Sequence, residues 1–134
     1  MRSLIFLLLV DPKFQKTRFC VAIVTFMLVL VLGSIPGARA TIGIYYPGIV
    51  LHAGTYSFIT LCLFGGTTGT PRRRAAISWL LVAAMGALDE YVQSFLSYRS
   101  ADIRDWSVDI AAALCCCLVA WMFWPAQLVR VEKR

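Results

Sequence analysis

Charged residues are scarce in this sequence: they occupy 15% of the 134 positions, and only seven residues are acidic. Apolar residues occupy 60%, and the mean hydropathy is +0.75. A soluble globular domain carries about 25% charged and about 45–50% apolar residues, so this composition excludes a soluble domain. Each helical crossing of a bilayer takes about 20 residues. The length therefore predicts an integral membrane protein with four crossings, short connections and no separate soluble domain.

The sequence also lacks internal repeats and the residue spacings of a metal site. Its five cysteines all lie in apolar stretches, where cysteine is commonly a small hydrophobe. The triplet 115–117 cannot converge on one ion, because consecutive helical residues point about 100° apart. We therefore expect no metal ion and no cofactor. The net charge of +6 comes from basic residues scattered between apolar blocks, so nucleic acid is not an expected partner.

Four apolar stretches have the length of a membrane span, and turn-forming residues separate them. They cover about residues 19–35, 47–64, 75–93 and 106–124. We predict an all-α transmembrane four-helix bundle that forms a single domain over residues 1–134. Residues 1–10 form a shorter apolar run, which as a helix would reach only about 12 Å. We expect a short N-terminal interfacial segment that is retained at the membrane surface; a cleaved signal peptide is the alternative.

The basic residues are divided unequally between the two sides of this bundle. Ten lie in the N-terminal segment, the connection 65–74 and the C-terminal tail, and three lie in the other two connections. Basic residues near span ends stay in the cytoplasm. Both termini are therefore predicted to be cytoplasmic, and the connections 36–46 and 94–105 are predicted to face outward.

Most of the acidic residues gather around the outward connection between the third and fourth spans. Five of the seven are Asp89, Glu90, Asp102, Asp105 and Asp109. His52 lies at a similar expected depth in the second span. A charge in the hydrocarbon costs about 2.5–3.5 kcal/mol by insertion scales, so such groups face the bundle interior and find partners.

Helical spacing predicts which of these polar side chains share a face. Glu90 and Gln93 are three residues apart, while Asp105 and Asp109, like His52 and Tyr56, are four apart. Arg99 and Arg104 are the cations of the short connection. The predicted network comprises His52, Tyr56, Glu90, Gln93, Arg99, Asp105 and Asp109. We expect Arg99 to pair with Glu90, Asp105 or Asp109, and His52 to face Glu90 or Gln93.

Two interpretations of this network stay open. In the first, it is structural, with an arginine bridging carboxylates to hold the outer connection on the bundle. In the second, it binds a polar headgroup or performs acid/base chemistry, with His52 and Glu90 as the titrating groups.

The stretch 90–109 resembles the signature of the VanZ-like membrane proteins, a family named for a protein linked to teicoplanin resistance. Glu90, Gln93, Arg99 and Asp105 match its first four positions in residue and spacing. Asp109 and Ala112 stand at its Asn and Gly positions. His52 and Tyr56 match the second half of the family's Asp-Lys-x-x-His-x-x-x-Tyr element, whose Asp-Lys pair is replaced here by Gly48 and Ile49. The resemblance extends over about residues 19–124.

The resemblance implies a small multi-pass protein of the bacterial cytoplasmic (inner) membrane, surrounded by membrane lipids. Three functions follow as candidates. The first is binding of a polar or lipid-linked envelope ligand at the outer face. The second is a structural or assembly subunit of a larger membrane complex, for example a photosynthetic or respiratory one. The third is an enzyme acting on a lipid headgroup with His52 or Glu90 as base, which is disfavoured because no nucleophile–base motif is present.

Overall fold

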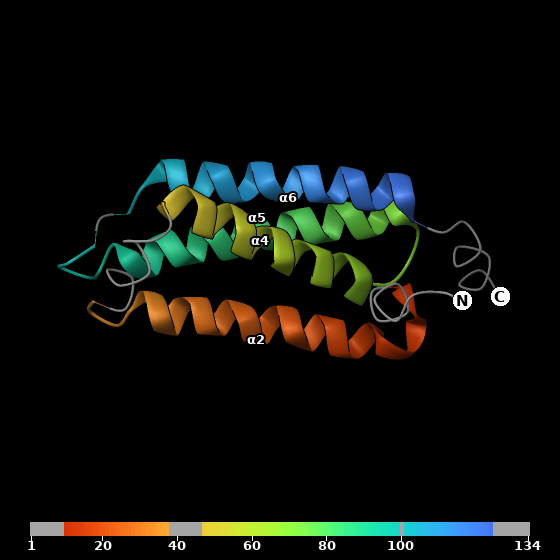
Figure 1. Cartoon of the computed structure of the whole chain (residues 1–134), viewed down its shortest axis with the longest axis horizontal. Coiled ribbons are helices and arrows are strands. Elements are labelled where there is room, and N and C mark those ends of the chain that lie inside the picture. Colours follow the sequence, from red (N-terminus) through yellow and green to blue (C-terminus); the bar gives the residue numbers. More distant parts are fainter. Residues whose placement is uncertain (1–9, 38–46, 100, 125–134) are drawn as a thin grey trace.

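A computed structural model describes residues 10–37, 47–99 and 101–124 of the chain. A short 3₁₀ turn, η1 (Pro12–Phe14), precedes helix α2 (Gln15–Gly33). Helices α4 (Gly48–Gly66), α5 (Pro71–Gln93) and α6 (Ile103–Phe123) follow, and together the elements form a helical bundle (Figure 1).

These four helices are long and apolar enough to cross a membrane. The shortest have 19 residues, which at 1.5 Å per residue is about 28 Å, close to the thickness of the hydrocarbon core. The expectation of an all-α four-helix bundle is thus confirmed, and the chain is a multi-pass membrane protein by the length and composition of its helices.

Local signals in the sequence set where two of the helices begin. The Thr70 side chain accepts a hydrogen bond from the Arg73 amide, and Pro71 takes the first helical position of α5. The Asp102 carboxylate accepts one from the Arg104 amide at the start of α6. We expected these helices to begin at 75 and 106; both begin earlier because these N-caps precede the apolar runs.

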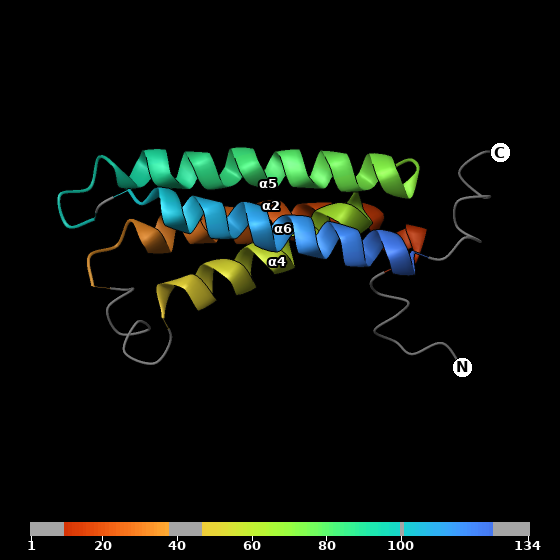
Figure 2. The same cartoon turned by 90° about the horizontal axis from the view of Figure 1, so that it is seen from above.

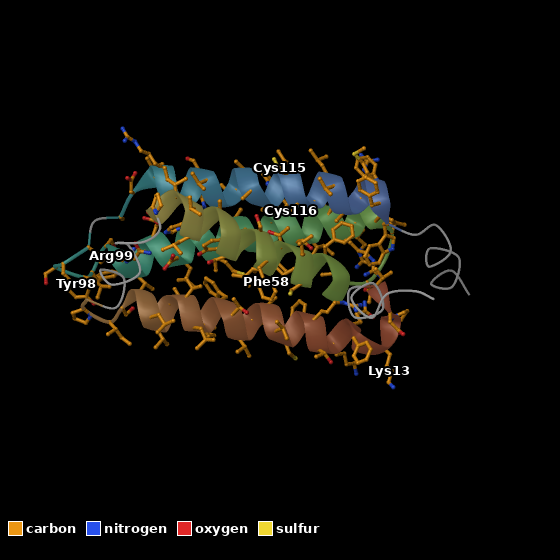
Figure 3. The ribbon with its side chains drawn as sticks, in the orientation of Figure 1. Lys13, Phe58, Tyr98, Arg99, Cys115 and Cys116 are labelled. Carbon is orange, nitrogen blue, oxygen red and sulfur yellow. The ribbon has the colours of Figure 1, made fainter. Side chains whose placement is uncertain are left out.

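The bundle has two chemically different ends. We call the end where α2 and α5 finish and α4 and α6 begin the acidic end, because the acidic residues 89, 90, 102, 105 and 109 lie there. The opposite end, with Lys13, Lys16, Arg18 and Arg72–Arg74, is the basic end. Figure 3 shows Lys13 at the opposite end of the molecule from Tyr98 and Arg99.

Helix α4 is the central helix and contacts the other three. In the most apolar 18-residue stretch of each helix, 44% of α4 is buried inside the bundle, compared with 17% of α2 and of α6. It also runs diagonally across the bundle, so that α2 and α4 lie close together at the basic end and diverge toward the acidic end (Figures 1 and 2).

Gly66 explains the close approach at the basic end. A Cβ atom at this position would lie 2.7 Å from the Phe19 backbone nitrogen of α2, so only glycine fits there. Farther along the bundle, a core of mostly apolar side chains, from alanine to tyrosine in size, fills the space between the helices. It consists of Ala22, Phe26, Tyr56, Ile59, Cys62, Leu63, Val82, Met85 and Ala113.

The predicted interfacial segment cannot be compared with the structure, because residues 1–9 lie outside the described residues. The described part differs from the expected span 19–35 at both ends, since α2 ends at Gly33. Helix α2 begins at Gln15, so Lys16 and Arg18 belong to its first turn instead of preceding it.

Candidate functional site

The first turns of α4 place His52 and Tyr56 on one face, directed into the acidic end. Their side chains are both buried, and their rings stack in parallel with centroids 6.0 Å apart. The spacing of four residues predicted this shared face, and the structure shows what lies opposite each ring.

Both nitrogens of the His52 ring meet carboxylates of α6. Nδ1 lies 3.0 Å from Oδ1 of Asp109, and Nε2 lies 3.4 Å from Oδ2 of Asp105. A neutral imidazole has one N–H donor and one acceptor nitrogen. A neutral ring can therefore donate to only one of these two carboxylates. For both ring nitrogens to be hydrogen-bonded, one further proton is needed, either on the ring or on one of the carboxyl groups.

We expected His52 to face Glu90 or Gln93 of α5, but the carboxylates that its ring nitrogens meet lie on α6. The diagonal course of α4 is the reason, since it brings the beginning of α4 against the first turns of α6. His52 therefore ties these two helices together.

Asp109 is completely buried between α4, α5 and α6. Its Oδ2 atom would lie 3.1 Å from a Cβ atom at position 86, so Gly86 on α5 leaves the room that this carboxylate occupies. Nearby, the Trp106 indole N–H donates to the Ala83 carbonyl at 3.0 Å. The acidic end thus joins α5 closely to α6 as well.

Asp89 is a site residue that the predicted network omits. It is 2% exposed, and its Oδ2 accepts a hydrogen bond from the Tyr56 hydroxyl at 3.4 Å. The sequence does contain a signal for it, because Asp89 lies four residues before Gln93 and so shares its helix face. In the structure the buried positions of α5 recur at helical spacing as 74, 78, 82, 85, 86, 89 and 93. Asp89 and Gln93 continue that row.

Glu90 has a different task from the one expected. Its Oε2 accepts a hydrogen bond from the backbone N–H of Asp102, the N-cap of α6, at 2.6 Å. It does not line the cavity described below. Glu90 therefore holds the α5–α6 connection, in agreement with the structural interpretation for this one residue.

Arg99 is brought back to the end of α5 by a series of turns in the connection. The Leu96 amide donates to the Gln93 carbonyl, and the Arg99 amide donates to the Leu96 carbonyl. The Arg99 guanidinium then donates to the Gln93 side-chain oxygen. Its pairing with Glu90, Asp105 or Asp109 stays a prediction. The other cation of the connection, Arg104, is exposed.

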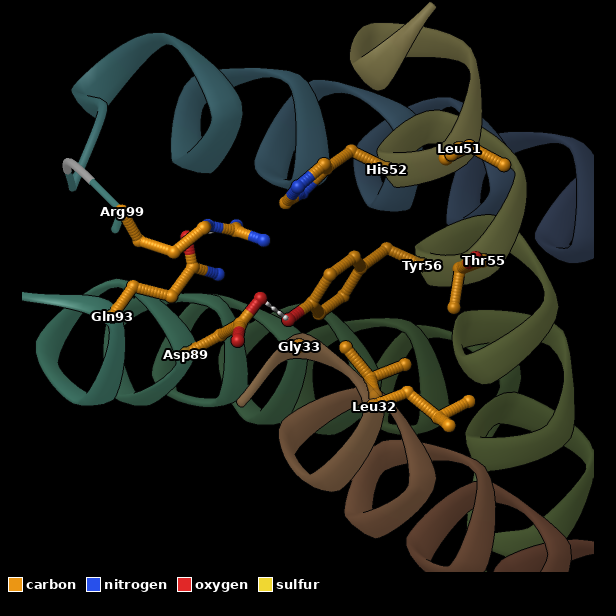
Figure 4. A pocket seen from close by; sticks show the side chains of 10 residues that line it. Leu32, Gly33, Leu51, His52, Thr55, Tyr56, Asp89, Gln93 and Arg99 are labelled. Carbon is orange, nitrogen blue, oxygen red and sulfur yellow. Dashed lines mark hydrogen bonds between the residues drawn. The ribbon is translucent and has the colours of Figure 1, made fainter. Parts of the chain in front are cut away.

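A cavity of about 200 Å³ opens where α2 and α4 diverge (Figure 4). Its polar side comprises His52, Thr55, Tyr56, Asp89, Gln93 and Arg99. Its other side comprises Val29, Leu32, Gly33 and Leu51. Leu32 is half exposed on the outer surface of α2. The cavity thus joins a charged interior to an apolar wall that reaches the outer surface of the bundle.

The basic end contains a second buried polar group that sequence reasoning used only for orientation. Arg18 and Arg74 are 7% and 6% exposed. Arg18 Nε donates to the Gly65 carbonyl at 2.9 Å, and Arg74 donates to the Phe64 and Gly69 carbonyls. These contacts satisfy carbonyl groups at and just beyond the C-terminus of α4, which have no partner within the helix.

The cysteine triplet on α6 diverges as helical geometry requires: Cys115 is exposed, Cys116 is half-buried and Cys117 is buried. Figure 3 labels Cys115 and Cys116 on this helix. Within the described residues, no three His, Cys, Asp or Glu side chains are grouped so as to hold a metal ion.

Comparison with known proteins gives no relative: no protein-family model, curated protein or solved structure matches this chain. The functional argument therefore depends on the geometry of the site.

Proposed function

We propose that this chain is a VanZ-like protein of the bacterial cytoplasmic membrane that binds a polar or lipid-linked envelope ligand in the cavity at its acidic end. In this proposal the acidic end faces outward and both termini are cytoplasmic, in line with the distribution of basic residues. The conclusion depends chiefly on one observation: charged side chains line a cavity whose other wall is apolar and includes the half-exposed Leu32.

The two walls match the two parts of a lipid-linked molecule. Asp89, Gln93 and Arg99 supply a carboxylate, an amide and a guanidinium for a polar group. Leu32 and Leu51 offer an apolar surface for the chain attached to it. Ligand sites typically combine an apolar lining with a few polar groups that fix orientation.

A second candidate, a structural or assembly subunit of a larger membrane complex, is favoured by a different observation. The contacts of His52 with Asp105 and Asp109, and of Glu90 with the Asp102 amide, join helices and a connection to one another. A network of this kind stabilises a scaffold without any ligand.

A substitution that fills the cavity without altering its polar groups distinguishes the two candidate functions. We expect Leu32→Trp to remove a lipid or small molecule that copurifies with the wild-type protein in mild detergent. The matched control is Val31→Trp, because Val31 is also exposed on α2 but does not line the cavity. Native mass spectrometry of the purified proteins measures what each retains.

Retention by the wild type and by Val31→Trp, with loss in Leu32→Trp, supports ligand binding. Equal retention in all three proteins would contradict it. Copurification of a protein partner, with nothing bound in the cavity, would instead favour the subunit.

A further inference from the structure

Asp89 differs from the other buried carboxylate of the bundle in its surroundings. Asp109 faces the His52 ring at 3.0 Å. Asp89 is 2% exposed and accepts one long hydrogen bond, from the Tyr56 hydroxyl. A carboxylate removed from water is costly to keep ionised unless a cation or several donors face it.

The open side of this carboxylate is the cavity. Figure 4 shows the Asp89 and Tyr56 side chains pointing toward each other at its border, with Gln93 and Arg99 nearer the α5–α6 connection. Thr55 adds a hydroxyl from α4. A group that enters beside Asp89 therefore meets the two carboxylate oxygens and the Tyr56 hydroxyl oxygen, all of which accept hydrogen bonds.

These acceptors discriminate between classes of ligand group. An anionic group beside Asp89 would be repelled, and its place in the cavity is on the Arg99 side. A quaternary ammonium has no N–H to donate and is usually held by a cage of aromatic rings. A primary ammonium has three donors, one for each of the available oxygens.

We propose that the cavity binds a primary ammonium group, which donates to the Asp89 carboxylate and to the Tyr56 hydroxyl oxygen. This inference rests on the proposed function, because it specifies the chemistry of the ligand in the same cavity. The ammonium belongs either to a lipid headgroup of the ethanolamine type or to a free small amine. In both cases an anionic part of the molecule lies toward Arg99.

The test uses the full chain, purified without added lipid and then offered defined probes. Phosphatidylethanolamine, phosphatidylcholine and phosphatidylglycerol present a primary ammonium, a quaternary ammonium and no nitrogen. Binding is measured by native mass spectrometry for each lipid, and free phosphoethanolamine is added as a competitor. We expect the ethanolamine lipid to bind at least about tenfold more tightly than the other two, which is the effect of one charge-assisted hydrogen bond.

Asp89→Asn should abolish this preference, since it keeps the shape of the side chain and removes its charge. The matched control is Asp102→Asn, which makes the same charge change at an exposed position of the same end and keeps a residue suited to the N-cap. The control should bind as the wild type does. Displacement by free phosphoethanolamine identifies the free amine as a sufficient ligand, while its failure to displace bound phosphatidylethanolamine identifies the lipid.

Equal binding of the three lipids by the wild-type protein would overturn the ammonium assignment, and this readout needs no variant to fold. If, in that case, the Leu32→Trp protein does not retain a lipid that the wild type binds, the proposed binding function stands and only the ammonium assignment fails. If Leu32→Trp also has no effect, both proposals fail.

Discussion

Asp89 and Glu90 are neighbours in the sequence and have separate roles in the structure. Consecutive helical residues point about 100° apart, so Asp89 borders the cavity while Glu90 reaches the N-cap of α6. From the sequence alone, both carboxylates are expected at the same depth in the membrane. Which of them faces the interior depends on the rotation of α5, and the buried positions Val82 and Met85 settle that in favour of Asp89.

The two carboxylates that meet His52 should contribute unequally to stability. Asp109 is buried and lies 3.0 Å from the ring, while Asp105 is partly exposed and lies 3.4 Å away. We expect Asp109→Ala to lower the free energy of unfolding by about 3 kcal/mol, the scale for breaking a buried ion pair. Asp105→Ala should lower it by less than about 1 kcal/mol, as for exposed pairs.

Unfolding of both variants by SDS in mixed micelles, followed by tryptophan fluorescence, measures the two free energies. Equal losses, or a larger loss for Asp105→Ala, would contradict the assignment of Asp109 as the principal partner of His52.

At the scale of elements, the hydropathy of the sequence was sufficient to predict four helices and their order. Each stretch contains enough apolar residues for a span, and this property does not depend on its neighbours. The partner of His52 was not predictable in the same way, because it depends on how α4 crosses the bundle. That crossing goes with a close contact at Gly66, some 14 positions from His52 in the sequence, where a Cβ atom would meet the α2 backbone.

The need for glycine at position 66 can be tested by substitution. We expect Gly66→Ala to destabilise the bundle by about 1–3 kcal/mol, because the added Cβ would overlap the α2 backbone at Phe19. The control is Gly54→Ala in the same helix, where no atom lies within 4 Å of the new Cβ. Alanine should be neutral there or stabilise the helix by up to about 1 kcal/mol.

The same SDS titration compares the two alanine variants with the wild-type protein. A Gly66→Ala protein as stable as Gly54→Ala would show that α2 and α4 do not need this contact, and the divergence of the helices would require another cause.

At the scale of the whole molecule, the proposed orientation can be tested directly. In a background without native cysteines, a cysteine introduced at Ala101 should react with an impermeant reagent added to intact cells. A cysteine at Thr68, in the connection at the basic end, should react only after lysis. Both positions are exposed, so accessibility of the side chain is matched. Labelling of Thr68 but not Ala101 from outside would place the acidic end in the cytoplasm.

The contact of His52 with α6 also bears on how the chain enters the membrane. The ribosome completes α4 before α6, so we expect the imidazole to be in place before Asp105 and Asp109 are inserted. The two carboxylates would then meet a partner on entering the membrane, without waiting for a later helix. Crosslinking between positions 52 and 109 in nascent chains of increasing length would show whether this contact forms as soon as α6 emerges.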